Sequence, residues 1–122
     1  MKQILLVFIG GGTGSILRYL ISKSLNNATV LPLGTLVVNV VGSLLIGFIL
    51  GLGYRQQMLS ANVMLLLATG FCGGFTTFSA FSYENHLFLK AGDFMSVGIY
   101  TISSLVLGIA ATFAGLYASR FI

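Results

Sequence analysis

The chain has 122 residues, of which 57% are hydrophobic and only 7% are charged. Soluble domains carry roughly 25% charged residues, so this composition excludes an ordinary soluble protein and is typical of one that spans a membrane. The net charge of +4 comes from basic residues dispersed along the chain, which argues against nucleic-acid binding. A single cysteine, Cys72, excludes an intrachain disulfide and a cysteine metal cluster.

Four apolar segments are long enough to cross a membrane as helices, which takes about 20 residues each. They cover residues 4–22, 33–53, 62–89 and 94–117. The connections between them are short, with no room for a separate soluble domain. We therefore expect one all-α transmembrane domain over residues 1–122.

The first segment carries Gly10 and Gly14, whose spacing allows close approach of a second helix. Arg18 lies late in the same segment. Its side chain either extends to the membrane surface or lends positive potential to an anion vestibule. Both interpretations stay open from the sequence alone.

The second segment places polar and small residues at every fourth position: Thr35, Asn39, Ser43, Gly47 and Gly51. Residues four apart share one helix face, so this helix has a stripe that is polar at its start and small at its end. A polar amide near the membrane centre needs a buried partner or a ligand. Asn39 is therefore either an interhelical contact or a binding residue.

The third segment is longer than one span requires and is interrupted near Gly73-Gly74, followed by hydroxyls and phenyl rings. Irregular backbone at membrane depth must be buried in protein or line a cavity, so we expect a broken helix with a polar site. Phe78 and Phe81 share a face after the break. Glu84 follows and is expected to make a helix-end or interhelical hydrogen bond.

The fourth segment repeats the fourfold spacing with Tyr100, Ser104, Gly108 and Thr112. Together with Asn39 as an amide donor, the positive edges of the rings of Phe78 and Phe81 could form a weakly attractive path for a small anion. The alternative is that these rings only pack. No nucleophile with a base and an orienting group is evident, so we do not expect an enzyme.

Basic residues are balanced between the two ends of a four-span arrangement. Three lie on the side of the termini and three on the other, namely Lys2, Arg55 and Arg120 against Arg18, Lys23 and Lys90. Orientation in the membrane follows an excess of Lys and Arg on one side, and here there is none. The count predicts insertion in both orientations and an antiparallel homodimer; the alternative is that a mild bias or a partner fixes one orientation.

Three stretches resemble a known family. They cover residues 11–19, 34–43 and 70–84, in segments one, two and three. In order and together they are similar to the small bacterial fluoride channels called Fluc or CrcB, which are multi-pass proteins of the cell membrane. The resemblance covers essentially the whole chain and implies antiparallel, dual-topology homodimers with two fluoride pores.

The resemblance also implies roles for particular residues. Asn39 would be the pore asparagine, and Phe78 and Phe81 the paired pore phenylalanines. The polar stripes would add Thr35 from the second helix, with Tyr100 and Ser104 from the fourth, while Arg18 would sit at the vestibule. Backbone carbonyls of Gly73 and Thr76 from both subunits would hold a central, structural Na⁺ ion, since hard cations take oxygen ligands.

Two other functions remain open from the sequence. One is a small, dual-topology, proton-coupled exporter, but that class needs a carboxylate in its first helix, and this first helix has none. The other is a membrane subunit that transports nothing, for which a helix break with hydrogen-bond donors would be unnecessary. The main hypothesis is passive efflux of fluoride from the cytoplasm.

Overall fold

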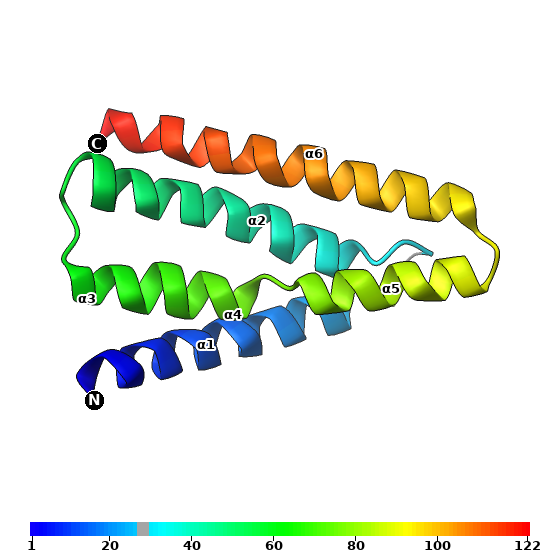
Figure 1. Ribbon diagram of the computed structural model, residues 1–122, viewed down its shortest axis with the longest axis horizontal. Helices are drawn as coiled ribbons and strands as arrows, with labels where there is room; N and C mark the ends of the chain where they lie inside the picture. Colours follow the sequence, from blue (N-terminus) through cyan, green and yellow to red (C-terminus); the bar gives the residue numbers. More distant parts are fainter. Residues whose placement is uncertain (27–29) are drawn as a thin grey trace.

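Four membrane-length helical rows lie side by side in the computed structural model, which describes residues 1–26 and 30–122 (Figure 1). The rows are α1 (Lys2–Leu25), α2 (Leu33–Leu50), a third row made of several pieces, and α6 (Phe94–Ala118). A π-helical turn, Gly51–Arg55, extends α2, and a 3₁₀ turn, Ser119–Phe121, extends α6. Both termini lie at the same end of the molecule (Figure 1), as an even number of spans requires.

The third row consists of α3 (Ala61–Met64), a π-helical stretch (Leu65–Cys72), α4 (Gly73–Phe75) and α5 (Phe78–Lys90). With its neighbours it gives four helices long and apolar enough to cross a membrane. Their bounds are Lys2–Leu25, Leu33–Arg55, Ala61–Lys90 and Phe94–Phe121. The predicted all-α architecture with four spans is therefore confirmed, each helix being slightly longer than its apolar segment because polar residues continue the helix beyond it.

Short polar side chains start several of these helices by accepting a backbone hydrogen bond. Ser60 does so for α3, Thr77 for α5 and Asp93 for α6. Asp93, which also accepts from the hydroxyl of Ser96, has its pKa held below the usual aspartate range by these bonds. The turn before it uses Gly92 at φ +74°, a conformation that suits glycine.

Glycines set how closely the rows approach. A Cβ placed on Gly10 or Gly14 of α1 would overlap backbone oxygens of Leu66 and Phe71 in the third row. Gly47 of α2 lies in the same way against the backbone of Thr112 in α6. These glycines carry the close packing expected of small residues in membrane helices.

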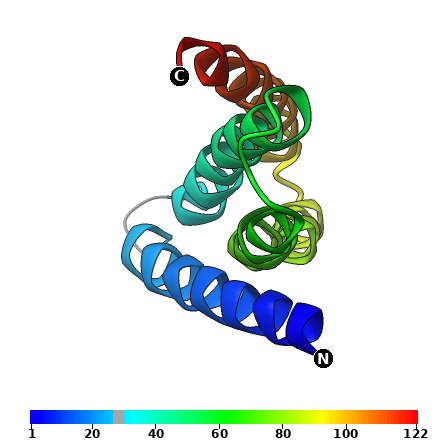
Figure 2. The same ribbon diagram turned by 90° about the vertical axis from the view of Figure 1, so that its left-hand side faces the viewer.

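The rows are not equivalent in position. The two views place α1 on one side of the third row and α6 on the opposite side (Figures 1 and 2). Helix α2 packs against α6, against the third row and against α1. Many large apolar side chains along the helices are exposed on the outer surface of the molecule, as suits helices that face lipid or another subunit. The largest fully buried side chains include Tyr100, Val38 and Thr35.

Candidate functional site

The break in the third row falls at Thr76 and Thr77, both of which have extended backbone conformations. The sequence placed the interruption near Gly73-Gly74, but these two glycines are helical and form the start of α4. The preceding helix ends at Phe75, and the side chain of Thr77 starts the next one by accepting from the Ala80 N–H, as the residue before a new helix does. A break inside the third span is therefore confirmed, with this shift in position.

Asn39 of α2 binds both backbone polar groups of Thr77. Its Oδ1 accepts from the Thr77 N–H at 2.7 Å, and its Nδ2 donates to the Thr77 carbonyl at 3.0 Å. The interhelical contact anticipated for Asn39 is present, and it is made to the irregular backbone itself. An amide nitrogen carries two hydrogens, so one N–H of Asn39 remains for another acceptor.

The break also changes the donors available to two carbonyls. In an α-helix each carbonyl accepts from the N–H four residues on. The Thr77 N–H, which would serve Gly73, goes to Asn39, and the Ala80 N–H, which would serve Thr76, goes to the Thr77 hydroxyl. The carbonyl oxygens of Gly73 and Thr76 are thus released from the helical pattern.

A cavity of about 440 Å³ lies beside the break, between α2, the third row and α6. It is lined by six of the nine residues that the sequence singled out for the pore and the cation: Asn39, Gly73, Thr76, Phe78, Phe81 and Ser104. The other three, Thr35, Tyr100 and Arg18, do not line it. The structure therefore gathers most of the predicted site in one space, from three different helical rows.

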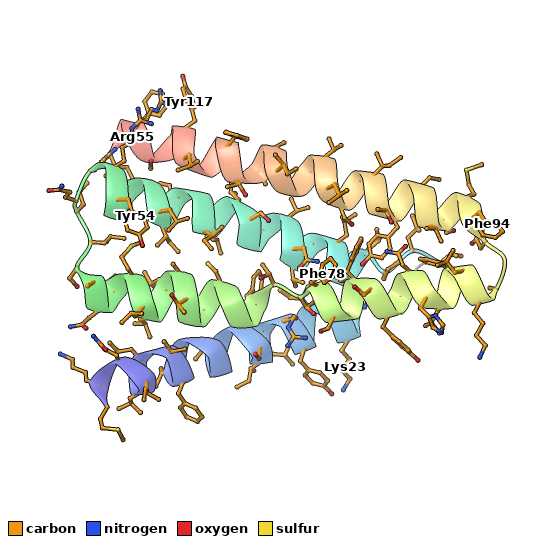
Figure 3. All side chains as sticks on the ribbon, in the orientation of Figure 1. Lys23, Tyr54, Arg55, Phe78, Phe94 and Tyr117 are labelled. Atoms are coloured by element: carbon orange, nitrogen blue, oxygen red, sulfur yellow. The ribbon has the colours of Figure 1, made fainter. Side chains whose placement is uncertain are left out.

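The two phenyl rings lie together at this cavity. The centroids of Phe78 and Phe81 are 5.8 Å apart, with their planes tilted by 39°. Phe78 lies next to the break (Figure 3). Its side chain is 79% exposed, whereas the ring of Phe81 meets the ring of Tyr100 edge to face at 5.1 Å. This contact fixes the orientation of Phe81 and leaves the pair tilted rather than stacked.

Two serines also line the cavity. Ser43 donates to the Asn39 carbonyl at 2.6 Å, so its proton is used. The Ser104 oxygen is buried and, within the part of the chain that the structure describes, has no hydrogen-bond partner. A buried hydroxyl without a partner costs free energy, and such exceptions call for an explanation such as an ion or a water.

Thr35 and Tyr100 belong to a separate cluster around Glu84. The Thr35 hydroxyl donates to Glu84 Oε1 and the Tyr100 hydroxyl to Oε2, both at 2.6 Å. Thr35 is 1% exposed and Tyr100 2% exposed. The interhelical hydrogen bond expected for Glu84 is confirmed, but the two hydroxyls use their protons on the carboxylate.

The sequence offered a signal for this cluster that the fourfold spacing alone did not reveal. Thr35 and Tyr100 each lie one turn before a cavity residue, Asn39 and Ser104, in helices that begin at the end of the molecule where α5 finishes. Glu84 lies midway along α5, Phe78–Lys90. Three polar residues at one membrane depth are expected to meet when no water is present.

Arg18 contacts the break from the opposite side. Its Nε donates to the Gly74 carbonyl at 2.9 Å, and the Ser15 hydroxyl points to the same oxygen at 3.4 Å. In the described structure the side chain therefore meets the backbone of the third row.

Residues 5–116 match the family described as CrcB-like protein, Camphor Resistance (CrcB). The chain belongs to the CrcB family. A similar protein from Gloeothece citriformis, 52% identical over 96% of both chains, is named fluoride-specific ion channel FluC. Relatives of the same name from Phocaeicola vulgatus and Azobacteroides pseudotrichonymphae are 46% and 40% identical, covering 98% and 99% of this chain and 100% and 98% of their own.

Family membership confirms the resemblance seen in the three sequence stretches. Together with the four apolar helices, it makes this CrcB chain a multi-pass membrane protein. The relatives are named as channels and not as enzymes, in agreement with the missing catalytic set.

Proposed function

We propose that the chain forms a channel through which fluoride leaves the cytoplasm passively. The observation that carries the proposal is the cavity beside the break, where amide, hydroxyl and ring-edge donors from α2, the third row and α6 converge. The names of relatives that match almost the full length support fluoride as the ion. Conduction needs binding that is favourable but weak, and none of the cavity-lining residues carries a charged side chain.

In this proposal fluoride exchanges water for the remaining N–H of Asn39, the Ser104 hydroxyl and the ring edges of Phe78 and Phe81. The ring edges are positive without carrying a full charge, so they attract an anion without holding it. Thr35 and Tyr100 act less directly, because their protons are given to Glu84. Tyr100 supports the path through its edge contact with the ring of Phe81.

Efflux from liposomes tests the function. Purified protein is reconstituted into liposomes loaded with potassium fluoride or potassium chloride, and a potassium ionophore dissipates the membrane potential. We expect rapid fluoride release without a proton gradient and very little chloride release. Equal release of the two anions, or release that needs a proton gradient, would contradict the proposal; the second result would favour an exporter.

We further propose that the functional unit is an antiparallel homodimer. The three-against-three distribution of basic residues supports insertion in both orientations, and Lys23 lies well away from Arg55 along the long axis of the molecule (Figure 3). A cysteine at the exposed Met58, in a chain whose buried Cys72 is replaced by alanine, reports orientation. Labelling of about half the sites from outside the cell is expected; labelling of all or none indicates a single orientation.

A central structural Na⁺ completes the proposal. The carbonyls of Gly73 and Thr76, released from helical bonding, would hold it, since a hard cation prefers oxygen ligands and broken helices supply them. The ion would supply positive charge that links subunits at the break. Removing Na⁺ should lower both fluoride flux and the thermal stability of the dimer in detergent, and unchanged thermal stability after exhaustive removal would contradict a structural ion.

A further inference from the structure

Arg18 brings a charged side chain to the middle of the broken span. Gly74, whose carbonyl accepts from Arg18 Nε, lies near the midpoint of the Ala61–Lys90 span. Charged groups within membrane spans are costly and usually have a specific partner. The two acidic residues of the chain are engaged elsewhere, Glu84 with two hydroxyls and Asp93 with Ser96. The partner at the break is therefore a backbone carbonyl.

The contact lies outside the proposed ion path. The cavity is formed by α2, the third row and α6, whereas α1 packs on the other side of the third row (Figures 1 and 2). Neither Arg18 nor Gly74 lines the cavity. In this structure the guanidinium and the cavity are thus separated by the third row itself.

Two side chains from two helices hold the two ends of the break. Asn39 of α2 binds the N–H and carbonyl of Thr77, and Arg18 of α1 binds the carbonyl of Gly74. Gly74 is in the last turn before the break, where free carbonyls carry partial negative charge and a cation is favourable. Between these two fixed points lies Thr76, which lines the cavity.

We propose that Arg18 is a positioning residue of the channel: it fixes the break from the α1 side, through the Gly74 carbonyl, and does not meet the ion. The inference rests on the proposed fluoride channel and adds a residue that shapes the path from outside it. A guanidinium has planar, preoriented N–H donors, while a lysine ammonium is a point charge on a flexible stem. A lysine at position 18 would therefore keep the positive charge without reproducing the hydrogen bond to the Gly74 carbonyl.

The experiment compares R18K, which keeps the charge, R18Q, which removes it, and K23Q as the matched control. Lys23 is in the last turn of the same helix, so K23Q removes one positive charge from α1, as R18Q does, without touching the contact at the break. Fluoride efflux is measured over a series of fluoride concentrations at low and high ionic strength, with dimer assembly followed by size-exclusion chromatography. We expect R18K and R18Q to lower fluoride flux about tenfold at every fluoride concentration, saturating ones included. The flux of K23Q should stay close to that of the wild-type protein.

Other outcomes decide against the proposal. Wild-type flux in R18K, with a loss in R18Q that high fluoride concentration restores, means that Arg18 acts through its charge. If the Arg18 variants fail to assemble, Ser15→Ala, which removes the longer contact to the same carbonyl, must lower maximal flux about two- to threefold, and unchanged flux overturns the proposal. Absence of fluoride flux in the wild-type protein is a different result, since it refutes the proposed function itself.

Discussion

Adjacent glycines in the third row face opposite surroundings. A Cβ on Gly74 would overlap the backbone of Gly11 in α1, with the Gly11 Cα only 2.9 Å away. A Cβ on Gly73 would meet nothing within 4 Å, and Gly73 lines the cavity. One residue step therefore separates a face packed backbone to backbone from a face that is hollow.

The difference shows how one broken helix serves two purposes. On the α1 side, glycines remove side chains so that the helices touch, and the free Gly74 carbonyl is bound by Arg18. On the α2 and α6 side, space is kept, and polar groups are left with unused donors. Packing holds the break still, and the hollow side can then present donors at fixed positions, which suits transport of a small ion.

The largest effect should come from Asn39→Asp on the hollow side. A carboxylate cannot donate to the Thr77 carbonyl, so it would set two oxygens against each other and place a negative charge in the anion path. We expect fluoride flux to fall about 100-fold or more, since an uncompensated buried charge costs several kcal/mol. Efflux from liposomes measures this, with Asn62→Asp at the exposed start of α3 as the control. Flux within a few-fold of wild type in Asn39→Asp would remove Asn39 from the path.

The glycine pair tests the comparison directly. Gly74→Ala should destabilise the protein by about 1–3 kcal/mol, as overpacking does, because backbone atoms cannot yield to the new methyl group. Gly73→Ala has room for its methyl group and should keep thermal stability within about 1 kcal/mol of wild type, the usual cost difference between glycine and alanine in a helix. Thermal unfolding followed by far-ultraviolet circular dichroism compares the two. Equal destabilisation would show that the two faces are not different.

A smaller effect is expected from Phe81→Ile, which keeps bulk but removes the polarised ring edge. The substitution also deletes the edge contact with Tyr100. We expect fluoride flux to fall about tenfold, with assembly intact. The control is Phe71→Ile, whose ring stacks on Phe75 at 5.5 Å and does not line the cavity. If both variants conduct normally, the rings at the cavity only pack.

The four spans and the broken third span could be predicted from the sequence, because hydropathy and glycine placement are local signals. Asn39, Phe78 and Phe81 could be grouped because an amide and two ring edges are suitable donors for a small anion, and Ser104 joined them through the family resemblance. What helix spacing specifies is depth and face along one helix. It does not specify which neighbouring helix a face meets.

Two details depended on that missing information. Thr35 and Tyr100 continue the same stripes as Asn39 and Ser104, yet they bond to Glu84, because α5 reaches their depth and brings a carboxylate. Arg18 packs against the third row because glycines of α1 draw the two backbones together, and the break leaves a carbonyl opposite the guanidinium. Both outcomes follow from helix packing in three dimensions, where partners come from distant parts of the sequence.

Ser104→Ala should have the smallest effect and separates the purposes of the two faces most clearly. Because the Ser104 oxygen is buried without a partner in the described structure, removing it deletes an unsatisfied polar group and should leave stability unchanged or raise it by about 1 kcal/mol. Flux should nevertheless fall about two- to fivefold, since the anion loses one of few donors along the path.

Ser103→Ala, one residue earlier in α6 and not lining the cavity, is the control for flux. If Ser104→Ala is more stable but conducts less fluoride, the hollow face retains a hydroxyl that costs stability because the ion needs it as a donor. A destabilised Ser104→Ala protein, or one with normal flux, means that this hydroxyl belongs to the packing and that the path runs past other donors.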